Sequence, residues 1–385
     1  MVVSMSTPAR PSAAYGWRIG SLAGTPIYLG RSWPVIAVLI VVVFGPNLAR
    51  PDRGGSYGYL LAAGYAVLLL VSVLVHEAAH ALAARWRGHP VSRIVADVWG
   101  GHTVYDATHS SPTSTALVAV VGPLSNLVLA GVVWGIRALT TNETALTLLG
   151  IVAFANLLVG LFNLLPGLPL DGGQIVSALV WRATGSKGRG LVAAGWLGRV
   201  VAVLTVAWFA LRPLAEGRPP DLFDLVWPVA IAFFLWQGAT GAVRAGHIHE
   251  ATAGLATDVL EPLTLVAGTA TVAQVEAALT AGAWVAAADP GGWPLGVVDA
   301  ASAAAVPAGS RDRTAVASIT VAQPAAWVIP LPGDAVLTEL ISVMSERELS
   351  LAVVVDEGTR DIRGLARAER INAVVGAELS RRGRR

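Results

Sequence analysis

The chain has 385 residues, of which 54% are hydrophobic and only 14% are charged, and its formal net charge is +2. Soluble domains carry nearer a quarter charged residues, so this composition indicates a membrane protein, and the small charge argues against a nucleic-acid partner. The chain has no cysteine, which excludes disulfides, thiolate metal sites and cysteine nucleophiles and leaves His, Asp and Glu as metal ligands.

Six apolar stretches follow one another along the first part of the chain, and about twenty apolar residues suffice to cross the hydrocarbon core of a bilayer. They cover residues 33–49, 59–85, 115–139, 146–166, 190–212 and 222–242, and the first of them is short. The N-terminal segment before them, residues 1–32, lacks the apolar core and the small-residue cleavage site of a signal peptide. We therefore expect six spans and no cleaved leader.

Basic residues flank these stretches unevenly. With the N-terminus inside, the inner segments carry about twice as many basic residues as the outer loops, which predicts a cytoplasmic N-terminus and a cytoplasmic region after residue 244. Arginine is strongly preferred, since Lys187 is the one lysine, and together with the richness in Ala, Val and Gly this favours a GC-rich bacterial genome. We expect a multi-pass protein of a bacterial cell membrane.

The composition changes after the last span. Residues 33–244 form the membrane part, residues 245–256 a linker, residues 257–376 an α/β module and residues 377–385 a basic tail. The module has two similar halves, each predicting strand, helix, strand and strand, at 263–266, 272–281, 284–288 and 295–298 and at 326–329, 335–347, 351–355 and 362–365. These halves resemble a pair of cystathionine-β-synthase (CBS) motifs. The fold class is therefore an α-helical integral membrane protein with about six transmembrane helices and a C-terminal soluble CBS-like α/β module.

The strongest local motif is His76-Glu77-Ala78-Ala79-His80, inside the second apolar stretch. Positions i and i+4 of a helix share a face, so both imidazoles can reach one metal ion, and Glu77 beside them can act as the base toward a water that the metal polarises. Ionisable residues at membrane depth are costly and usually functional. A buried His–Glu pair that only holds helices together would not explain the four-residue spacing.

A catalytic zinc ion usually has three protein ligands. The candidates for the third ligand are His89, Asp97, His102, Asp106, His109 and Asp171. The first five lie in the polar segment after the second span, where polar residues are expected in any case. Asp171 instead follows the fourth span, after the helix-breaking Pro166 and Pro169 and before Gly172 and Gly173. With the N-terminus inside, the second and fourth spans both run inward, so Asp171 and the two histidines reach the same half of the membrane.

Three motifs now combine in order: His76-Glu-Ala-Ala-His80, Gly122-Pro-Leu-Ser-Asn126 and Asn163-Leu-Leu-Pro-Gly-Leu-Pro-Leu-Asp171-Gly. Over residues 15–245 the chain resembles the site-2 protease family of intramembrane zinc metalloproteases, in the subgroup with a C-terminal CBS pair. The resemblance implies that His76, His80 and Asp171 bind one Zn²⁺ per chain and that Glu77 is the general base. It also implies that Asn163 holds the substrate carbonyl or oxyanion, and that Gly122, Pro123 and Asn126 shape the third span beside the site.

Two further segments bear on function. Val95–Asp106 is similar to the family's membrane-associated β-hairpin, whose edge could hold an unwound substrate by β-augmentation, the alternative being an ordinary loop hairpin. Nucleotide-binding CBS motifs usually carry a Thr or Ser and an Asp after the last strand, where this chain offers Ala366 and Glu369. The tail could therefore serve an adenine nucleotide or a protein partner.

The predicted function is hydrolysis of peptide bonds in transmembrane or juxtamembrane segments, as in regulated intramembrane proteolysis. By analogy with the family, the partners are single-span membrane proteins such as anti-sigma factors, together with the lipid bilayer, and no nucleic acid. Two alternatives are a CBS-regulated transporter and a non-catalytic membrane scaffold. A transporter would predict broken helices in both halves, whereas the clear break lies at Pro166–Gly173, and the intact Glu77 argues against a scaffold.

Overall fold

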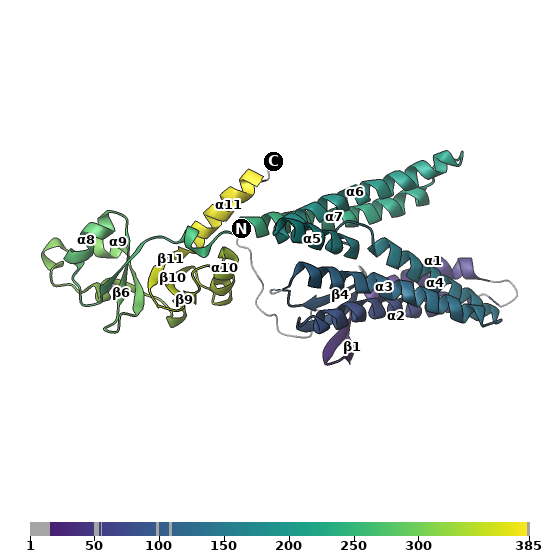
Figure 1. Cartoon of the computed structure of the whole chain (residues 1–385), viewed down its shortest axis with the longest axis horizontal. Coiled ribbons are helices and arrows are strands. Elements are labelled where there is room, and N and C mark those ends of the chain that lie inside the picture. Colours follow the sequence, from purple (N-terminus) through teal and green to yellow (C-terminus); the bar gives the residue numbers. More distant parts are fainter. Residues whose placement is uncertain (1–15, 50–53, 55, 98–99, 108–109, 383–385) are drawn as a thin grey trace. The chain divides into compact units, whose positions relative to one another are not determined.

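The structure, a computed structural model, describes residues 16–49, 54, 56–97, 100–107 and 110–382. The chain divides into two compact units, with the division at Gly246/His247 near the end of one helix. The first unit contains the apolar helices and a small sheet, and the second is the α/β tail (Figure 1). Each unit is described by itself.

The first unit is built on seven helices in the described part of the chain. They are α1 (Trp33–Leu48), α2 (Tyr57–Trp86), α3 (Pro112–Ala138), α4 (Glu143–Asn163), α5 (Asp171–Thr184), α6 (Lys187–Ala215) and α7 (Leu222–Ala251). By length and composition α2, α3, α4, α6 and α7 can cross a membrane, so five of the six expected spans are confirmed. The sixth expected span, α1, is an apolar helix of only 16 residues with Pro46 inside it.

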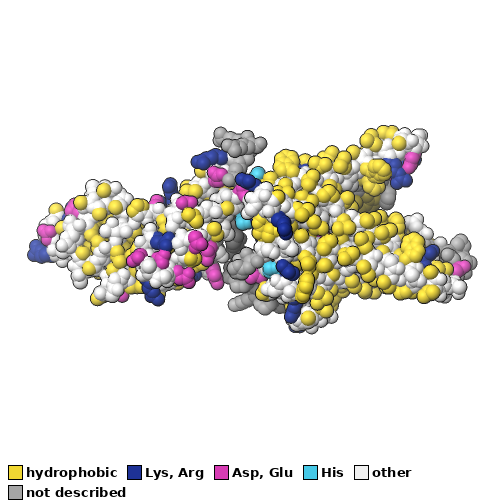
Figure 2. Space-filling model, viewed as in Figure 1, with side chains coloured by type: hydrophobic (Ala, Val, Ile, Leu, Met, Phe, Trp, Pro, Cys, Tyr) yellow, Lys and Arg dark blue, Asp and Glu magenta, His cyan; other side chains and the backbone are white. Residues whose placement is uncertain are grey.

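The outer surface of this unit is apolar. Hydrophobic side chains cover most of the helical face seen in Figure 2, with few charged side chains among them. Large apolar residues such as Val132 on α3 and Trp208 on α6 are more than half exposed. A surface of this kind is unfavourable in water and favourable in lipid, so the unit is a multi-pass membrane structure.

Helix α3 packs against α2, α4 and α5. Its buried residues recur mostly every four positions and include Ser114, Val118, Gly122, Asn126 and Ala130. This spacing places them on one face of the helix, and small residues there allow neighbouring helices to approach closely. The buried face of α3 is the wall against which the site is built.

A four-stranded sheet lies in the same unit, in the order β1 (Trp17–Leu22), β2 (Thr25–Leu29), β3 (Val91–Asp97) and β4 (Gly100–Tyr105). The expected hairpin at Val95–Asp106 is present as β3 and β4, and it begins earlier, at Val91. Strands β1 and β2 lie in the N-terminal segment, where the sequence suggested none, and β2 pairs in parallel with β3. The sheet therefore ties residues 17–29 to the membrane unit.

Residues 164–170 form a non-helical segment between α4 and α5, at the place where the sequence predicted a helix break. The following helix α5 was not predicted, because Pro166, Pro169 and the two glycines read as a turn. A Cβ added to Gly172 would lie 2.4 Å from the carbonyl oxygens of Leu164 and Leu165, so only glycine fits where α5 folds back on this break. The fold-back fixes where α5 begins, and α5 begins with Asp171.

The second unit contains the two expected strand–helix–strand–strand halves. The first half comprises β5 (Leu263–Ala267), α8 (Val272–Thr280), β6 (Trp284–Ala288) and β7 (Pro294–Val298), and the second comprises β9 (Val328–Leu331), α10 (Leu337–Glu346), β10 (Leu351–Asp356) and β11 (Ile362–Arg367). Between and around them lie α9 (Ala300–Ala304), β8 (Thr320–Ala322), α11 (Ala368–Arg382) and the 3₁₀ turns η2 (Ala256–Val259), η3 (Ala308–Ser310), η4 (Val316–Ile319) and η5 (Ala325–Trp327). The sheet orders are β5-β6-β7-β8 and β11-β10-β9.

One apolar core joins the two halves of the tail. It includes Ala286 and Val297 from the first sheet and Val353 and Leu365 from the second. The fully buried Trp327 completes this core, and its indole N–H donates to the carbonyl oxygen of Pro294 in the other half. The halves therefore pack as one module, as a CBS pair is expected to do.

Candidate metal centre

The two histidines of the motif face the same side of α2. His76 and His80 are one helical turn apart and buried, and their Nε2 atoms lie 3.0 Å from each other. Helix periodicity alone brings them together, as the sequence predicted.

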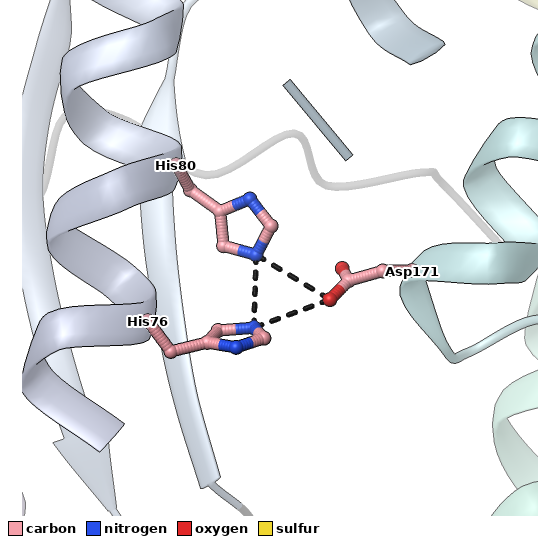
Figure 3. A group of neighbouring side chains, drawn as sticks. All are labelled: His76, His80 and Asp171. Carbon is pink, nitrogen blue, oxygen red and sulfur yellow. Dashed lines mark hydrogen bonds and ion pairs between the residues drawn. The ribbon is translucent and has the colours of Figure 1, made fainter. Parts of the chain in front are cut away.

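Asp171 completes a triangle with them. As the first residue of α5, its carboxylate lies at the positive end of the helix dipole. Its Oδ2 atom is 3.1 Å from His76 Nε2 and 3.5 Å from His80 Nε2 (Figure 3). The three side chains form the metal-ligating cluster found among the described residues. The structure thus unites the three residues that the resemblance nominated as ligands.

The Nδ1 atoms of both histidines face hydrogen-bond acceptors on the outer side of the cluster. His80 Nδ1 is 2.7 Å from the carbonyl oxygen of Val118, and His76 Nδ1 contacts Asn126 Oδ1. Both partners are acceptors, so each Nδ1 donates and each neutral Nε2 carries a lone pair. Within the described chain Asp171 Oδ2 is buried and accepts no hydrogen bond. Three electron-rich atoms therefore face one another, and two imidazoles with one carboxylate are a donor set that suits zinc.

A glycine leaves room beside both Nε2 atoms. A Cβ added to Gly122 on α3 would lie 2.3 Å from His80 Nε2 and 2.7 Å from His76 Nε2. Zinc–nitrogen bonds are about 2.0–2.1 Å long, so the methyl group would crowd the space that an ion bound by both nitrogens needs. The residues present fit the metal that the chemistry implies.

Glu77 lies against β4. Thr103 Oγ1 is 2.8 Å from Glu77 Oε2 and 3.0 Å from the Glu77 carbonyl oxygen, and the hydroxyl donates to them. A Cβ added to Gly101 would approach the Glu77 Cγ to 2.2 Å, so a glycine is needed where this strand crosses the carboxylate. Strand β4 therefore fixes the position of the glutamate.

These groups line a cavity of about 420 Å³. Its walls also include Asn163, the last residue of α4, and Tyr105, Gln174 and Phe234. Asn163 is thus in the same cavity as Glu77, although the break after α4 separates it from Asp171.

The other described candidates for the third ligand do not belong to this triangle. His89 Nε2 is 2.8 Å from the hydroxyl of Ser114, and His102 lines the cavity but pairs with Asp97 at 3.7 Å. Asp106 donates its backbone N–H to Pro90. His109 lies outside the described residues.

Sequence reasoning missed three residues beside the site. Thr103 holds Glu77, while Ser72 and Asn156 are buried in the cavity wall behind His76. The signal for the last two was present, because each is a polar residue inside an apolar span, where such residues are rare.

Known proteins resemble parts of this chain. The model of peptidase family M50 matches residues 64–142 and 137–207. A protein of Synechocystis sp. with the provisional name zinc metalloprotease sll0528 is 34% identical over 241 residues, 60% of this chain and 61% of its own length. Rip3 of Mycobacterium tuberculosis, also provisionally named a zinc metalloprotease, is 35% identical over 230 residues, 57% of each chain. The chain thus spans about three fifths of the length of these curated relatives.

Solved structures also match parts of the chain. The site-2 protease from Methanocaldococcus jannaschii covers 60% of this chain and 96% of its own, at 22% identity and a TM-score of 0.43. The CBS domain of a bacterial CNNM/CorC family Mg²⁺ transporter, solved in complex with ATP, covers 34% of this chain and 94% of its own, at 18% identity and a TM-score of 0.28.

Proposed function

We propose that this chain is an intramembrane zinc metalloprotease of peptidase family M50, the site-2 protease family. The observation that carries the proposal is the buried triangle of His76 Nε2, His80 Nε2 and Asp171 Oδ2, with the Glu77 carboxylate beside it. These three residues would hold one zinc ion per chain and leave one coordination position open. The ion would supply Lewis acidity, lowering the pKa of water and polarising the scissile carbonyl.

Glu77 would be the general base and then the general acid. Thr103 engages Oε2, so Oε1 is the oxygen that would take a proton from the attacking water and return it to the leaving amine. A hydrogen bond from Thr103 also restricts rotation of the carboxylate, which keeps the base in one orientation. Burial of Glu77 excludes the bulk solvent that would otherwise compete for the proton.

The substrate would lie extended along β4. This strand pairs with β3 on one side and with no described strand on the other, so its free edge could add one strand of unwound substrate beside Glu77. Asn163, across the same cavity, would donate its amide N–H to the carbonyl oxygen under attack. A transmembrane helix must be locally unwound to present its peptide bonds in this way, which favours substrates with weak helices near the membrane surface.

The substrates would be single-span membrane proteins cut in or beside their transmembrane segments, as in regulated intramembrane proteolysis. Anti-sigma factors fit this class. The distribution of basic residues supports a cytoplasmic N-terminus and tail in a bacterial cell membrane.

The tail would regulate the protease through an adenine nucleotide or a protein partner. Polar groups near the end of β11 are engaged, since Arg367 binds Glu261 through two hydrogen bonds of 2.6 and 3.1 Å and contacts Glu369 at 3.1 Å. A nucleotide would have to compete with these ion pairs, which favours the protein partner. Calorimetry of the full chain with ATP and AMP distinguishes the two, because heat of binding at physiological concentrations would identify a nucleotide site.

The function is tested by comparing wild type with Glu77→Gln. We expect both purified proteins to contain one zinc ion per chain, because the substitution keeps the ligands. Quantitative proteomics of membranes from cells expressing each form should show fragments of single-span proteins only with the wild type. Absence of zinc from wild type, or equal fragment levels with Glu77→Gln, would overturn the proposal.

A further inference from the structure

A chain of three polar side chains lies behind His76, between α2, α3 and α4. Ser72, Asn126 and Asn156 are each at most 3% exposed, although the helices around them are largely apolar. Burying polar groups in this environment is unfavourable unless every donor and acceptor is matched. The hydrogen bonds of the three residues therefore define what the chain can do.

The direction of these hydrogen bonds is set at the end farthest from the site. The Ser72 hydroxyl donates to the carbonyl oxygen of Leu68 at 2.9 Å. Asn156 Nδ2 donates to the carbonyl oxygen of Val152 and to Ser72 Oγ, both at 2.9 Å. Backbone carbonyls can only accept, so the Asn156 amide cannot turn around without bringing two oxygens together. Its Oδ1 must therefore face Asn126.

This orientation is passed on to the histidine. Asn126 Nδ2 donates to Asn156 Oδ1 at 2.8 Å, which leaves Asn126 Oδ1 facing His76 Nδ1. Because that oxygen can only accept, the proton of the neutral imidazole lies on Nδ1. The lone pair then lies on Nε2, the atom that faces Asp171.

We propose that Asn156, anchored by Ser72 and by the Val152 carbonyl, is a positioning residue that fixes the tautomer and ring orientation of His76 through Asn126. The proposal rests on the zinc site proposed above. His80 provides the contrast, because its Nδ1 donates directly to the backbone carbonyl of Val118. One ligand is thus oriented by backbone that no substitution removes, and the other by side chains.

Loss of Asn156 would release this control. Without Asn156 Oδ1 as its acceptor, the Asn126 amide can rotate and present N–H to His76, which favours the tautomer that cannot bind metal through Nε2. Partners that orient metal-ligating histidines typically change metal affinity by about 10–100-fold when they are removed. We expect a weakening in that range for Asn156→Leu, measured by chelator competition on the full chain in detergent.

Two variants separate this role from mere packing. In Asn156→Asp burial keeps the carboxyl protonated, so its hydroxyl can donate to the Val152 carbonyl while its other oxygen accepts from Asn126, and zinc affinity should stay within about threefold of wild type. In an Asn126→Asp background either carboxylate oxygen can accept the hydrogen bond from His76 Nδ1, so adding Asn156→Leu should weaken zinc binding by no more than about twofold. Thr205→Val, which removes a hydroxyl bound to its own helix on α6, is the control and should leave affinity unchanged. Equal losses from Asn156→Leu in both backgrounds would overturn the proposal.

A second measurement does not depend on zinc. In metal-free Asp171→Ala protein labelled with ¹⁵N-histidine, where no carboxylate faces Nε2, NMR should find the His76 proton on Nδ1, and a mixture of tautomers once Asn156→Leu is added. Asn156→Ala serves if the leucine variant does not fold, as judged by its thermal melt. A proton on Nε2 before Asn156→Leu is added, or identical spectra with and without Asn156→Leu, would refute the relay. If wild type does not bind zinc, that result refutes the proposed function and not the relay.

Discussion

Gly122→Ala is the smallest change that tests the metal centre. The added methyl carbon would lie 2.3 Å from His80 Nε2, 2.4 Å from His80 Cε1 and 2.7 Å from His76 Nε2. Carbon atoms in van der Waals contact are about 3.5–4.0 Å from their neighbours, so each imidazole has to retreat by roughly 1 Å. Metal ligands tolerate errors of only about 0.2 Å in bond length, so both zinc–nitrogen bonds would be lost or badly strained.

The fold should survive this change. The atoms that clash are the far ends of two side chains, which can turn away without moving a helix. Alanine also favours a helix over glycine by about 0.8–1.0 kcal/mol, so the free energy of unfolding should not fall much. We therefore expect a folded protein whose zinc affinity is at least about a hundredfold weaker, beyond the loss typical of orienting residues.

Gly131→Ala is the matched control. Gly131 is on the same helix, is exposed, and has open space at its Cβ position. Both variants would be purified in detergent, checked by thermal melting, and compared by metal analysis and chelator competition. Gly122→Ala with the zinc content and affinity of wild type would refute the placement of the ion in the triangle.

Three further predictions follow from the same geometry. Asp171→Ala should lose both zinc and cleavage, whereas His102→Ala, which removes a residue of the same cavity, should keep both; the reverse pattern in metal analysis would reassign the third ligand. Thr103→Val should keep zinc but lower kcat by roughly tenfold, because the Glu77 carboxylate loses its restraining hydrogen bond. Thr103→Ser keeps the hydroxyl and should therefore keep the wild-type kcat. Equal kcat values for the two variants would remove Thr103 from the mechanism. Asn163→Ala should lower kcat by about 10²–10³ with a modest change in KM, as expected for loss of a donor to an oxyanion; a change in KM alone would make Asn163 a docking residue.

The sequence predicted those parts of the structure whose cause is local. Two histidines four residues apart on a helix must share a face, and the strand–helix–strand–strand halves of the tail follow from their own apolar periods. Local periodicity could not place Asp171 near the histidines. The Pro and Gly residues around it indicated a functional position, because such residues end a helix inside a membrane only where it lines a protein cavity. The family motifs then selected it from six candidates.

The parts of the structure that the sequence did not predict depend on long-range packing. Strands β1 and β2 turn at Ala23 and Gly24, both with positive φ, and Ala at the first position hides the Asn-Gly or Asp-Gly signal of such a hairpin. Asn156 is 30 residues from Asn126 and 84 from Ser72, so their hydrogen bonds exist only once α2, α3 and α4 have packed. A sequence can mark such residues as unusual for a membrane span, but it cannot pair them.

The spacing of residues in Gly122-Pro-Leu-Ser-Asn126 matches the spacing of the two histidines in His76-Glu-Ala-Ala-His80. On α3, Val118, Gly122 and Asn126 are four residues apart and lie on one face of the helix. The carbonyl of Val118 orients His80, Asn126 orients His76, and Gly122 between them leaves room beside both Nε2 atoms. Because α2 and α3 run in opposite directions, the later histidine meets the earlier α3 residue. The period of four in His76-Glu-Ala-Ala-His80 is thus matched by a period of four on the facing helix. A one-residue insertion between Gly122 and Asn126 would turn Asn126 away from His76 by about 100° and break the match.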